Sequence, residues 1–194
     1  EDTKERLRVF VLNDTREARQ ATLSWRLLGF DGEQFASEKK SITVDALQNE
    51  IVFDLPVSRL SAKGNMKRAV FVADLMDGET LLARKTVLFD KEKNLALPKT
   101  QVDMHVRVSN GAAQIELTAK RYTRFLQVHS KSNLLPFSDN FFDLLPGETK
   151  RIVQPVRDGV TAEQVKNDLE LFSAGDVVPR ASRLSDAFTR ARVF

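Results

Sequence analysis

Hydrophobic and polar residues alternate along several short runs in the first half of the chain. Between residues 21 and 27, Leu23, Trp25 and Leu27 all fall on one face. This period of two is typical of a strand with one buried and one solvated face. The same pattern, or a short apolar run, predicts further strands at 7–12, 33–44, 51–55, 69–76 and 80–89. Short strands at this density indicate a β-sandwich.

The second half repeats this organisation. Apolar residues occupy every second position of two consecutive runs: Val102, Met104, Val106 and Val108, then Ala113, Ile115, Leu117 and Ala119. Later strands are predicted at 124–130, 150–156 and 169–172. Thr161-Ala162-Glu163-Gln164 has the form of a capping box and predicts about two helical turns. The second half is therefore also expected to be a sandwich.

Turn signals separate the predicted strands. Asp31-Gly32, Asp77-Gly78 and Asn110-Gly111 each stand between two apolar runs. Such pairs are among the strongest local signals for a β-hairpin. Between residues 90 and 100 the pattern lapses into a charged segment that ends near Pro98, which is typical of a short linker. We therefore expect two domains, residues 1–96 and residues 97–194.

The most distinctive stretch is residues 136–150. A polar corner, Ser138-Asp139-Asn140, offers side chains that can bond neighbouring backbone groups. An apolar run at 141–145 predicts a buried strand, and Pro146-Gly147-Glu148 follows it. Proline presets one dihedral angle and glycine accepts a positive φ, so a type II turn is expected there.

Phe141 and Phe142 are adjacent within that predicted strand. Neighbouring side chains of a strand point to opposite faces. One ring is therefore expected in the core and the other at the surface. Because Phe137 and the polar corner are close by in sequence, we expect residues 137–142 to contact another domain.

The string Phe137-Ser138-Asp139-Asn140-Phe141-Phe142-Asp143-Leu144-Leu145-Pro146-Gly147-Glu148 resembles the signature of the C-terminal immunoglobulin-like domain of β-mannosidases of glycoside hydrolase family 2. Related exo-glucosaminidases carry a similar string. The resemblance is strongest in the second half of the chain. It implies an all-β protein of two tandem immunoglobulin-like β-sandwiches, belonging to a larger enzyme. The catalytic (β/α) barrel of the family, with its two catalytic glutamates, is absent from this sequence.

Composition narrows the range of partners. The 194 residues include 30 Lys and Arg against 27 Asp and Glu, spread along the chain with no basic block, which does not favour nucleic acid. No apolar run approaches 18 residues, so no membrane span is expected. The absence of cysteine excludes disulfides, thiol catalysis and thiolate metal sites. It leaves the compartment undecided, with a periplasmic or extracellular location favoured over a cytoplasmic one.

Candidate catalytic and ligand-binding residues are few. Asp139 and Asp143 are the carboxylate pair that a glycosidase would need, but nothing in the sequence places a pocket between them. His105 and His129 lack the spacing of zinc ligands and are interpreted as surface residues. We therefore predict no catalytic residue, no cofactor and no metal site in this chain.

Three further features allow two interpretations each. Asn13-Asp14-Thr15 is a glycosylation sequon, but an Asx-type turn closing the first strand is favoured. Trp25 could stack on a sugar, but its position between Leu23 and Leu27 favours the core. The arginines near the C-terminus could bind an anionic ligand, but a solvated tail docked by a few apolar side chains is favoured. They are Arg180, Arg183, Arg190 and Arg192.

Four functions remain to be compared. The favoured one is a non-catalytic accessory region of a β-mannosidase-like exo-glycosidase, whose partners are the other domains of the parent enzyme, above all its barrel. The alternatives are a carbohydrate-binding module or the accessory region of a related exo-glucosaminidase, with glycan as a second ligand. An independent adhesion domain pair would need an exposed edge strand or apolar patch.

Overall fold

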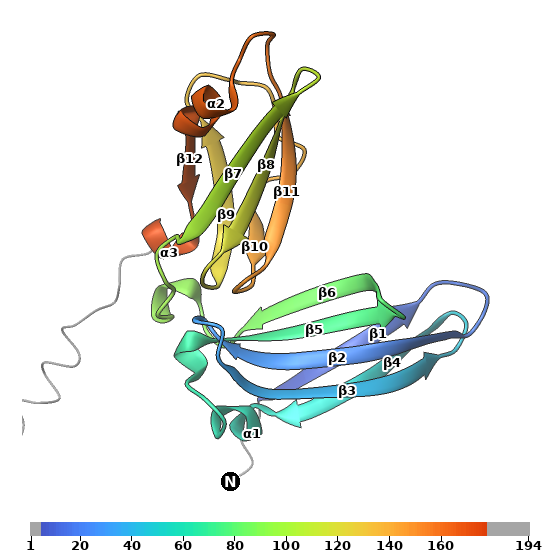
Figure 1. Cartoon of the computed structure of the whole chain (residues 1–194). Coiled ribbons are helices and arrows are strands. Elements are labelled where there is room, and N and C mark those ends of the chain that lie inside the picture. Colours follow the sequence, from blue (N-terminus) through green and yellow to red (C-terminus); the bar gives the residue numbers. More distant parts are fainter. Residues whose placement is uncertain (1–4, 178–194) are drawn as a thin grey trace, which may run out of the picture. The chain divides into compact units, whose positions relative to one another are not determined.

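The computed structural model describes residues 5–177 and contains two compact units. The first unit comprises the chain up to Gly29 together with Glu33–Phe89, and the second comprises Phe30–Gly32 together with the chain from Asp90 onward. Strands dominate both units and the helices are short (Figure 1). The expected all-β class is confirmed, and both units are immunoglobulin-like sandwiches.

The first unit has two antiparallel sheets, one behind the other in Figure 1. β1 pairs with β4, and the second sheet has the order β3-β2-β5-β6. A short helix and a 3₁₀ turn, which the sequence pattern did not predict, connect β4 to β5. The elements are β1 (Arg6–Asn13), β2 (Arg19–Gly29), β3 (Gln34–Val44), β4 (Gln48–Pro56), α1 (Val57–Ser61), η1 (Met66–Arg68), β5 (Ala69–Asp77) and β6 (Thr80–Leu88).

The core of the first unit is built around Trp25. Its side chain is buried, with Leu23 and Leu27 buried two positions away on either side along β2. The centre of the Trp25 ring lies 5.7 Å from that of Phe71 in β5 and 5.1 Å from that of Phe53 in β4, so Trp25 connects the two sheets. The core interpretation of Trp25 is confirmed, and this ring offers no platform to a sugar.

The Asn13 side chain closes the first strand as an Asx turn. Its Oδ1 accepts hydrogen bonds from the Thr15 backbone N–H (3.0 Å) and the Thr15 hydroxyl (2.7 Å). Its Nδ2 donates to the carbonyls of Glu17, Val44 and Asp45 at 2.9–3.0 Å. Because Asn13 is also buried, its amide is committed to the fold. The turn interpretation of the sequon is confirmed.

The second unit also has two antiparallel sheets, with orders β10-β9-β12 and β11-β8-β7. In Figure 1, β7, β8 and β11 lie in front of β9 and β10. The capping box at Thr161 begins α2, as predicted. The elements are η2 (Glu92–Asn94), β7 (Val102–Ser109), β8 (Ala112–Ala119), β9 (Thr123–Ser130), β10 (Phe142–Leu144), β11 (Thr149–Pro155), α2 (Ala162–Asp168), β12 (Leu169–Phe172) and α3 (Ala174–Val177).

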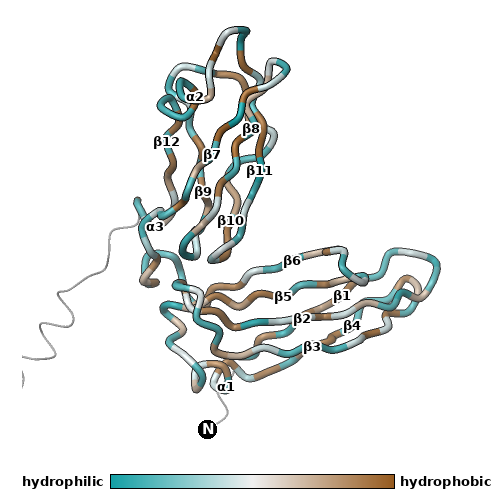
Figure 2. Tube along the Cα trace, in the orientation of Figure 1, coloured by the Kyte–Doolittle hydropathy of each residue, from teal (hydrophilic) through white to brown (hydrophobic). Residues whose placement is uncertain are grey.

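Alternating apolar residues of the strands form the core of the second unit. In Figure 2 the apolar and polar positions follow one another along β7. On β8 the predicted inward residues Ala113, Ile115, Leu117 and Ala119 are completely buried. They pack with residues from the opposite sheet, including Leu126 of β9 and Leu144 of β10. The predicted hairpin at Asn110-Gly111 is confirmed by the pairing of Ser109 with Ala112.

The segment that leads into β7 and the helix α3 that follows β12 are in contact. The Asp176 carboxylate of α3 accepts a hydrogen bond from the Thr100 backbone N–H at 3.1 Å and a second from the Thr100 hydroxyl. A Cβ on Gly175 would lie 1.8 Å from the carbonyl oxygen of Pro98. A side chain at position 175 is therefore excluded while these segments stay in contact. The predicted basic tail from Pro179 to Phe194 lies outside the described residues.

Candidate functional site

The polar corner of the 137–148 motif joins the two sheets of the second unit. The Asn140 amide acts like a strand residue: its Oδ1 accepts from the Val128 N–H at 2.9 Å and its Nδ2 donates to the Val128 carbonyl at 2.8 Å. Ser138 makes the equivalent pair with β11, where its N–H donates to the Val153 carbonyl at 2.8 Å and its Oγ accepts from the Val153 N–H at 2.9 Å. Two consecutive contacts therefore connect β9 of one sheet to β11 of the other.

Asp139, between these two residues, forms an ion pair at the surface. Its Oδ2 lies 2.7 Å from the Lys150 Nζ, and both side chains are about half exposed. The hydrogen bond and the positive charge of Lys150 hold the pKa of Asp139 below its usual value. Asp139 therefore remains ionised at neutral pH, and it lacks the raised pKa that a general acid of a glycosidase needs.

Asp143 is the hub of a partly buried network. Its carboxylate accepts hydrogen bonds from the Tyr122 hydroxyl (2.8 Å), the Arg124 guanidinium (2.8 Å) and the Phe125 backbone N–H (3.0 Å). Burial, followed by the charge of Asp143, raises the pKa of Tyr122 far above its usual value, so the phenol stays a hydrogen-bond donor. Burial opposes the charge on Arg124, but the bond to Asp143 more than offsets this and raises its pKa.

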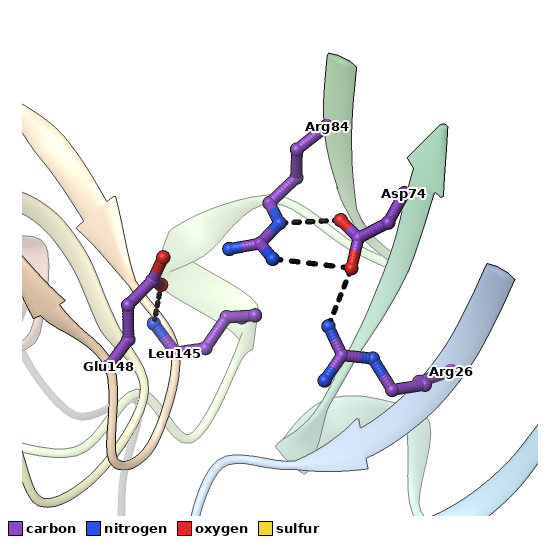
Figure 3. Close-up of polar contacts among 5 residues, drawn as sticks. All are labelled: Arg26, Asp74, Arg84, Leu145 and Glu148. Carbon is purple, nitrogen blue, oxygen red and sulfur yellow. Dashed lines mark hydrogen bonds and ion pairs between the residues drawn. The ribbon is translucent and has the colours of Figure 1, made fainter. Parts of the chain in front are cut away.

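The turn at the end of the motif has the expected geometry. Glu148 N–H donates to the Leu145 carbonyl at 3.0 Å, and Gly147 has a φ of +79°. The Glu148 carboxylate also accepts from the Leu145 N–H at 2.9 Å (Figure 3). The turn is further anchored to β8 by two backbone bonds, from Gly147 N–H to the Ala119 carbonyl and from Ala119 N–H to the Glu148 carbonyl. Pro146, Gly147 and Glu148 therefore shape the backbone of the sandwich.

The two adjacent phenylalanines do face opposite sides. Phe142 is half-buried and packs against the core, as does Phe137, whereas Phe141 is 60% exposed. The expected division is confirmed, but the predicted strand at 141–145 is too long. β10 begins only at Phe142, because Phe141 has a left-handed φ of +61°. A bend before the strand, rather than strand alternation alone, turns the Phe141 ring outward.

Sequence reasoning missed two other exposed rings, Phe125 of β9 and Phe172 of β12. They are 45% and 40% exposed. Phe172 follows the core residue Leu171 in a strand, so alternation could have placed it outside. Phe125 sits at a bulge, where β10 pairs Phe142 with Leu126 but Leu144 with Thr123. Its φ of +51° is not signalled by any glycine or asparagine in the sequence.

A second polar hub belongs to the first unit. The Asp74 carboxylate of β5 accepts from Arg26 of β2 at 2.7 Å and from Arg84 of β6 at 2.5 Å and 3.2 Å (Figure 3). Asp74 is 6% exposed, which makes it the most deeply buried acid of its unit. Three neighbouring strands are thereby cross-linked through their side chains.

The remaining candidates show no assembled chemistry. His105 and His129 both occupy exposed strand positions, which confirms their interpretation as surface residues. Among residues 5–177, no group of three His, Cys, Asp or Glu side chains lies close enough to hold a metal ion. No helix in this same range is long and apolar enough to cross a membrane.

A cavity of about 730 Å³ lies in the second unit, beside the loop that precedes the motif and the start of α2. Its polar lining is largely committed to the fold. Gln154 donates to the carbonyls of Asn133 and Leu135, Gln164 completes the capping box, and Asp168 accepts from Ser130. The cavity therefore offers an apolar hollow with few free polar groups. The Arg157 side chain also lines the cavity, but as a single cation, whereas small-molecule sites combine apolar walls with several convergent polar groups.

Comparison with known proteins assigns each unit to a domain family. Residues 5–94 match the model of the Mannosidase Ig/CBM-like domain, and residues 97–177 match that of an Ig-fold domain. No curated protein matches the chain. Among solved structures, the β-D-mannosidase from Dictyoglomus thermophilum is similar with a TM-score of 0.66 and 18% identity, over 89% of this chain and 21% of that one.

The exo-chitosanase CsxA of Amycolatopsis orientalis is similar with a TM-score of 0.51 and 15% identity, over 87% of this chain and 24% of that one. At these identities the likeness concerns the fold. The present chain spans between a fifth and a quarter of the length of those proteins. The resemblance drawn from residues 137–148 is confirmed. The chain belongs to the mannosidase immunoglobulin-like domain families, with a Mannosidase Ig/CBM-like domain followed by an Ig-fold domain.

Proposed function

We propose that this chain is the non-catalytic C-terminal accessory region of a β-mannosidase-like exo-glycosidase that hydrolyses terminal β-D-mannose residues. The observation that carries the proposal is the tandem of the two matched domains at residues 5–94 and 97–177. The similarity in fold to a β-D-mannosidase over 89% of the chain supports it. That similarity occupies only 21% of the mannosidase, which leaves room for other domains in the parent enzyme.

In this proposal the two domains brace the catalytic (β/α) barrel. Their boundaries are residues 1–96 and 97–194, a division supported by the matches that end at residue 94 and begin at residue 97. Both carboxylates of the motif serve the fold, since Asp139 pairs with Lys150 and Asp143 holds Tyr122 and Arg124. Neither is therefore offered as an acid or a nucleophile.

The motif is also proposed to contact another domain of the parent enzyme. Its residues divide into two groups. Most of them hold the sandwich together: Phe137, Ser138, Asp139, Asn140, Phe142, Asp143, Pro146, Gly147 and Glu148. Phe141 alone among the apolar residues at 137–142 is mostly exposed, at 60%. The contact is accordingly centred on the Phe141 ring, and the polar corner fixes its position.

The test compares this 194-residue chain with the whole protein from which it derives, using aryl β-D-mannoside and aryl β-D-glucosaminide. The chain alone should give no turnover above a control without protein, and the whole protein should prefer the mannoside. Turnover by the chain alone would show that the catalytic assignment is wrong. A whole protein inactive on both substrates would remove the glycosidase assignment altogether.

The accessory region of an exo-glucosaminidase is the second candidate. It is favoured by the similarity to CsxA, one of whose structures is described as an exo-β-D-glucosaminidase with 16% identity over 87% of this chain. A preference of the whole protein for the glucosaminide would select this candidate. Carbohydrate binding by the chain itself can be measured by affinity electrophoresis in mannan. Because Trp25 is buried, retardation in that gel would have to come from another surface.

A further inference from the structure

Three exposed phenylalanines lie on the β10-β9-β12 sheet or next to it. Phe172 of β12 is the direct pairing partner of Gln127 in β9. On the other side of β9, Phe142 pairs with Leu126, which brings Phe141 beside Gln127. Phe125 lies two residues before Gln127 on the central strand. Phe125, Phe141 and Phe172 thus lie on the strand of Gln127 or on the segments that flank it, and we call these three residues and Gln127 the aromatic face.

All three rings point away from the core. Each has a neighbour in sequence that packs inside the sandwich: Leu126 for Phe125, Phe142 for Phe141 and Leu171 for Phe172. Alternation along a strand places Phe172 opposite Leu171, whereas Phe125 and Phe141 have positive φ and stand at a bulge and at a bend. The exposed fractions of 45%, 60% and 40% agree with this placement. At about 200 Å² per ring, the three leave roughly 300 Å² of aromatic surface open, the size at which a patch on a soluble protein is often functional.

The backbone holds two of these rings in an unusual conformation. Of the four non-glycine residues with positive φ in the part of the chain that the structure describes, two are Phe125 (+51°) and Phe141 (+61°). Bulky residues rarely adopt this region, because their side chains crowd the backbone there. Such strain persists only where the surroundings impose it and is concentrated at functional sites. Two strained, exposed aromatic residues on one sheet face point to a surface with a partner.

The polar residues around the rings fix them in place. Asp143 accepts a hydrogen bond from the Phe125 N–H, and the Arg124 guanidinium lies 3.8 Å from the centre of the Phe125 ring. Asn140, bonded to both backbone groups of Val128, fixes the residue that precedes Phe141. Rings that are already ordered lose little side-chain entropy on association. The face is therefore prepared for binding before any partner arrives.

We propose that the aromatic face is the docking surface for the catalytic domain of the same polypeptide. This inference rests on the proposed function and extends its contact from Phe141, just before β10, to rings of β9 and β12. The chain spans only 21–24% of the similar enzymes, so a polypeptide of that kind supplies a large neighbouring domain. The face has the anatomy of a protein contact, with aromatic anchors in the centre and the polar His129 and Glu170 at its rim.

The residues of the aromatic face also indicate which groups a partner must present. An apolar patch must cover the three rings, and an amide, hydroxyl or backbone group must pair with the Gln127 amide among them. A lysine or arginine at the edge of the partner can lie over a ring, as Arg124 lies over Phe125.

The experiment places the photoreactive analogue p-benzoylphenylalanine at position 141 of the whole parent protein, and in a separate sample at position 134. Leu134 is 94% exposed, lies in the loop before the motif and does not belong to the aromatic face. Irradiation should cross-link position 141, and not position 134, to a peptide of the catalytic domain in the same polypeptide. Mass spectrometry identifies that peptide.

Three results would overturn the proposal. They are cross-linking of position 141 to residues 1–94, cross-linking between two copies of the protein, and the absence of any cross-link. A cross-link to added manno-oligosaccharide in place of protein would identify a glycan site and would overturn it as well. Activity on the aryl glycosides is measured separately. Loss of the proposed function, seen as an inactive parent protein, can thus be told apart from loss of the docking surface.

A variant series provides the second arm. Phe125→Asn and Phe141→Asn remove the rings while keeping a residue that tolerates positive φ, and Phe172→Thr keeps a strand former. In the 194-residue chain, the triple variant should unfold at the same temperature as the unmodified chain or slightly above it. In the whole protein, thermal inactivation should become at least about tenfold faster, because aromatic anchors contribute much of the free energy of a protein contact. Equal effects in both proteins would mean that the rings serve the sandwich alone.

Discussion

Asp74 of the first unit is buried and Asp143 of the second is partly buried, and each carboxylate pairs with arginine in a different way. Asp74 receives only side-chain donors, Arg26 and Arg84, from strands on either side of its own. Asp143 receives one guanidinium, one phenol and one backbone N–H. The first acid ties together strands that the backbone ladder already pairs, whereas the second supports a backbone that departs from the ladder.

The difference follows from how regularly the strand beside each acid pairs with its neighbours. β5 pairs with β2 in unbroken register from Thr22–Met76 to Gly29–Ala69. Its pairing with β6 shifts register between Leu75 and Met76, but the printed donors to Asp74 are side chains and not a backbone N–H. β9 bulges opposite Asp143, which leaves the Phe125 N–H without its ladder partner. The Asp143 carboxylate accepts from this N–H and also from the hydroxyl of Tyr122, a fully buried residue, and a buried donor without an acceptor costs about 1–3 kcal/mol. The acid of the second unit is therefore expected to matter more, although it is the more exposed of the two.

The largest expected effect is that of Asp143→Ala. It leaves the Tyr122 hydroxyl and the Phe125 N–H without their acceptor and the Arg124 charge with Glu92, 3.3 Å away, as its remaining partner, and should lower the free energy of unfolding of the second unit by about 3 kcal/mol. Urea unfolding followed at Tyr122, the only tyrosine, measures this unit, and Trp25, the only tryptophan, measures the first. A loss below about 1 kcal/mol would contradict the role assigned to the bulge.

Asp74→Ala should have a smaller effect. The side chains of Arg26 and Arg84 are 31% and 27% exposed and can return to water, and no backbone donor is left unpaired. We expect the first unit to lose about 1–2 kcal/mol, detected at Trp25 with little change at Tyr122. Should the Asp74 variant lose more than the Asp143 variant, the contrast between side-chain and backbone support would be reversed.

The smallest effect concerns the ion pair of Asp139 and Lys150. Because Lys150 lowers the pKa of Asp139 in the folded state, the pair stabilises the fold above the unfolded pKa near 3.8, and this contribution disappears as the pH falls through the folded pKa. With both side chains about half exposed, the contribution should be below ~0.5 kcal/mol.

Stability curves between about pH 5 and pH 2 check this expectation. The curve of Asp139→Asn should fall slightly less steeply than that of the unmodified chain, and Lys150→Met should match it. In 1 M salt the curves should converge, because exposed pairs are screened. A difference that survives high salt would mean that Asp139 is held by something other than Lys150.

Much of the fold could be predicted because its signals are local. The alternation in β7 and β8 and the Asn110-Gly111 turn specify a hairpin within some twenty residues, and the structure has that hairpin. Trp25 was placed in the core from its immediate neighbours Leu23 and Leu27. The capping box at Thr161 was identified from four consecutive residues.

The network and the aromatic face could not be predicted in the same way. Tyr122, Arg124 and Asp143 meet only through the pairing of β9 with β10, and no local pattern records that pairing. Phe125 has the side chain of a strand residue and the φ of a turn residue, which alternation cannot foresee. For the same reason the predicted strand at 141–145 began one residue too early. Contacts between distant segments, rather than local preferences, decide these positions.

The hydrogen bonds between Asp176 and Thr100 bear on how such a domain can be moved between genes. With its first and last segments in contact, the second sandwich begins and ends at the same place. A module of this form can be removed, or inserted into another gene, without moving its neighbours far apart. Gly175, pressed against the Pro98 carbonyl, is the position at which a substitution would separate the two ends.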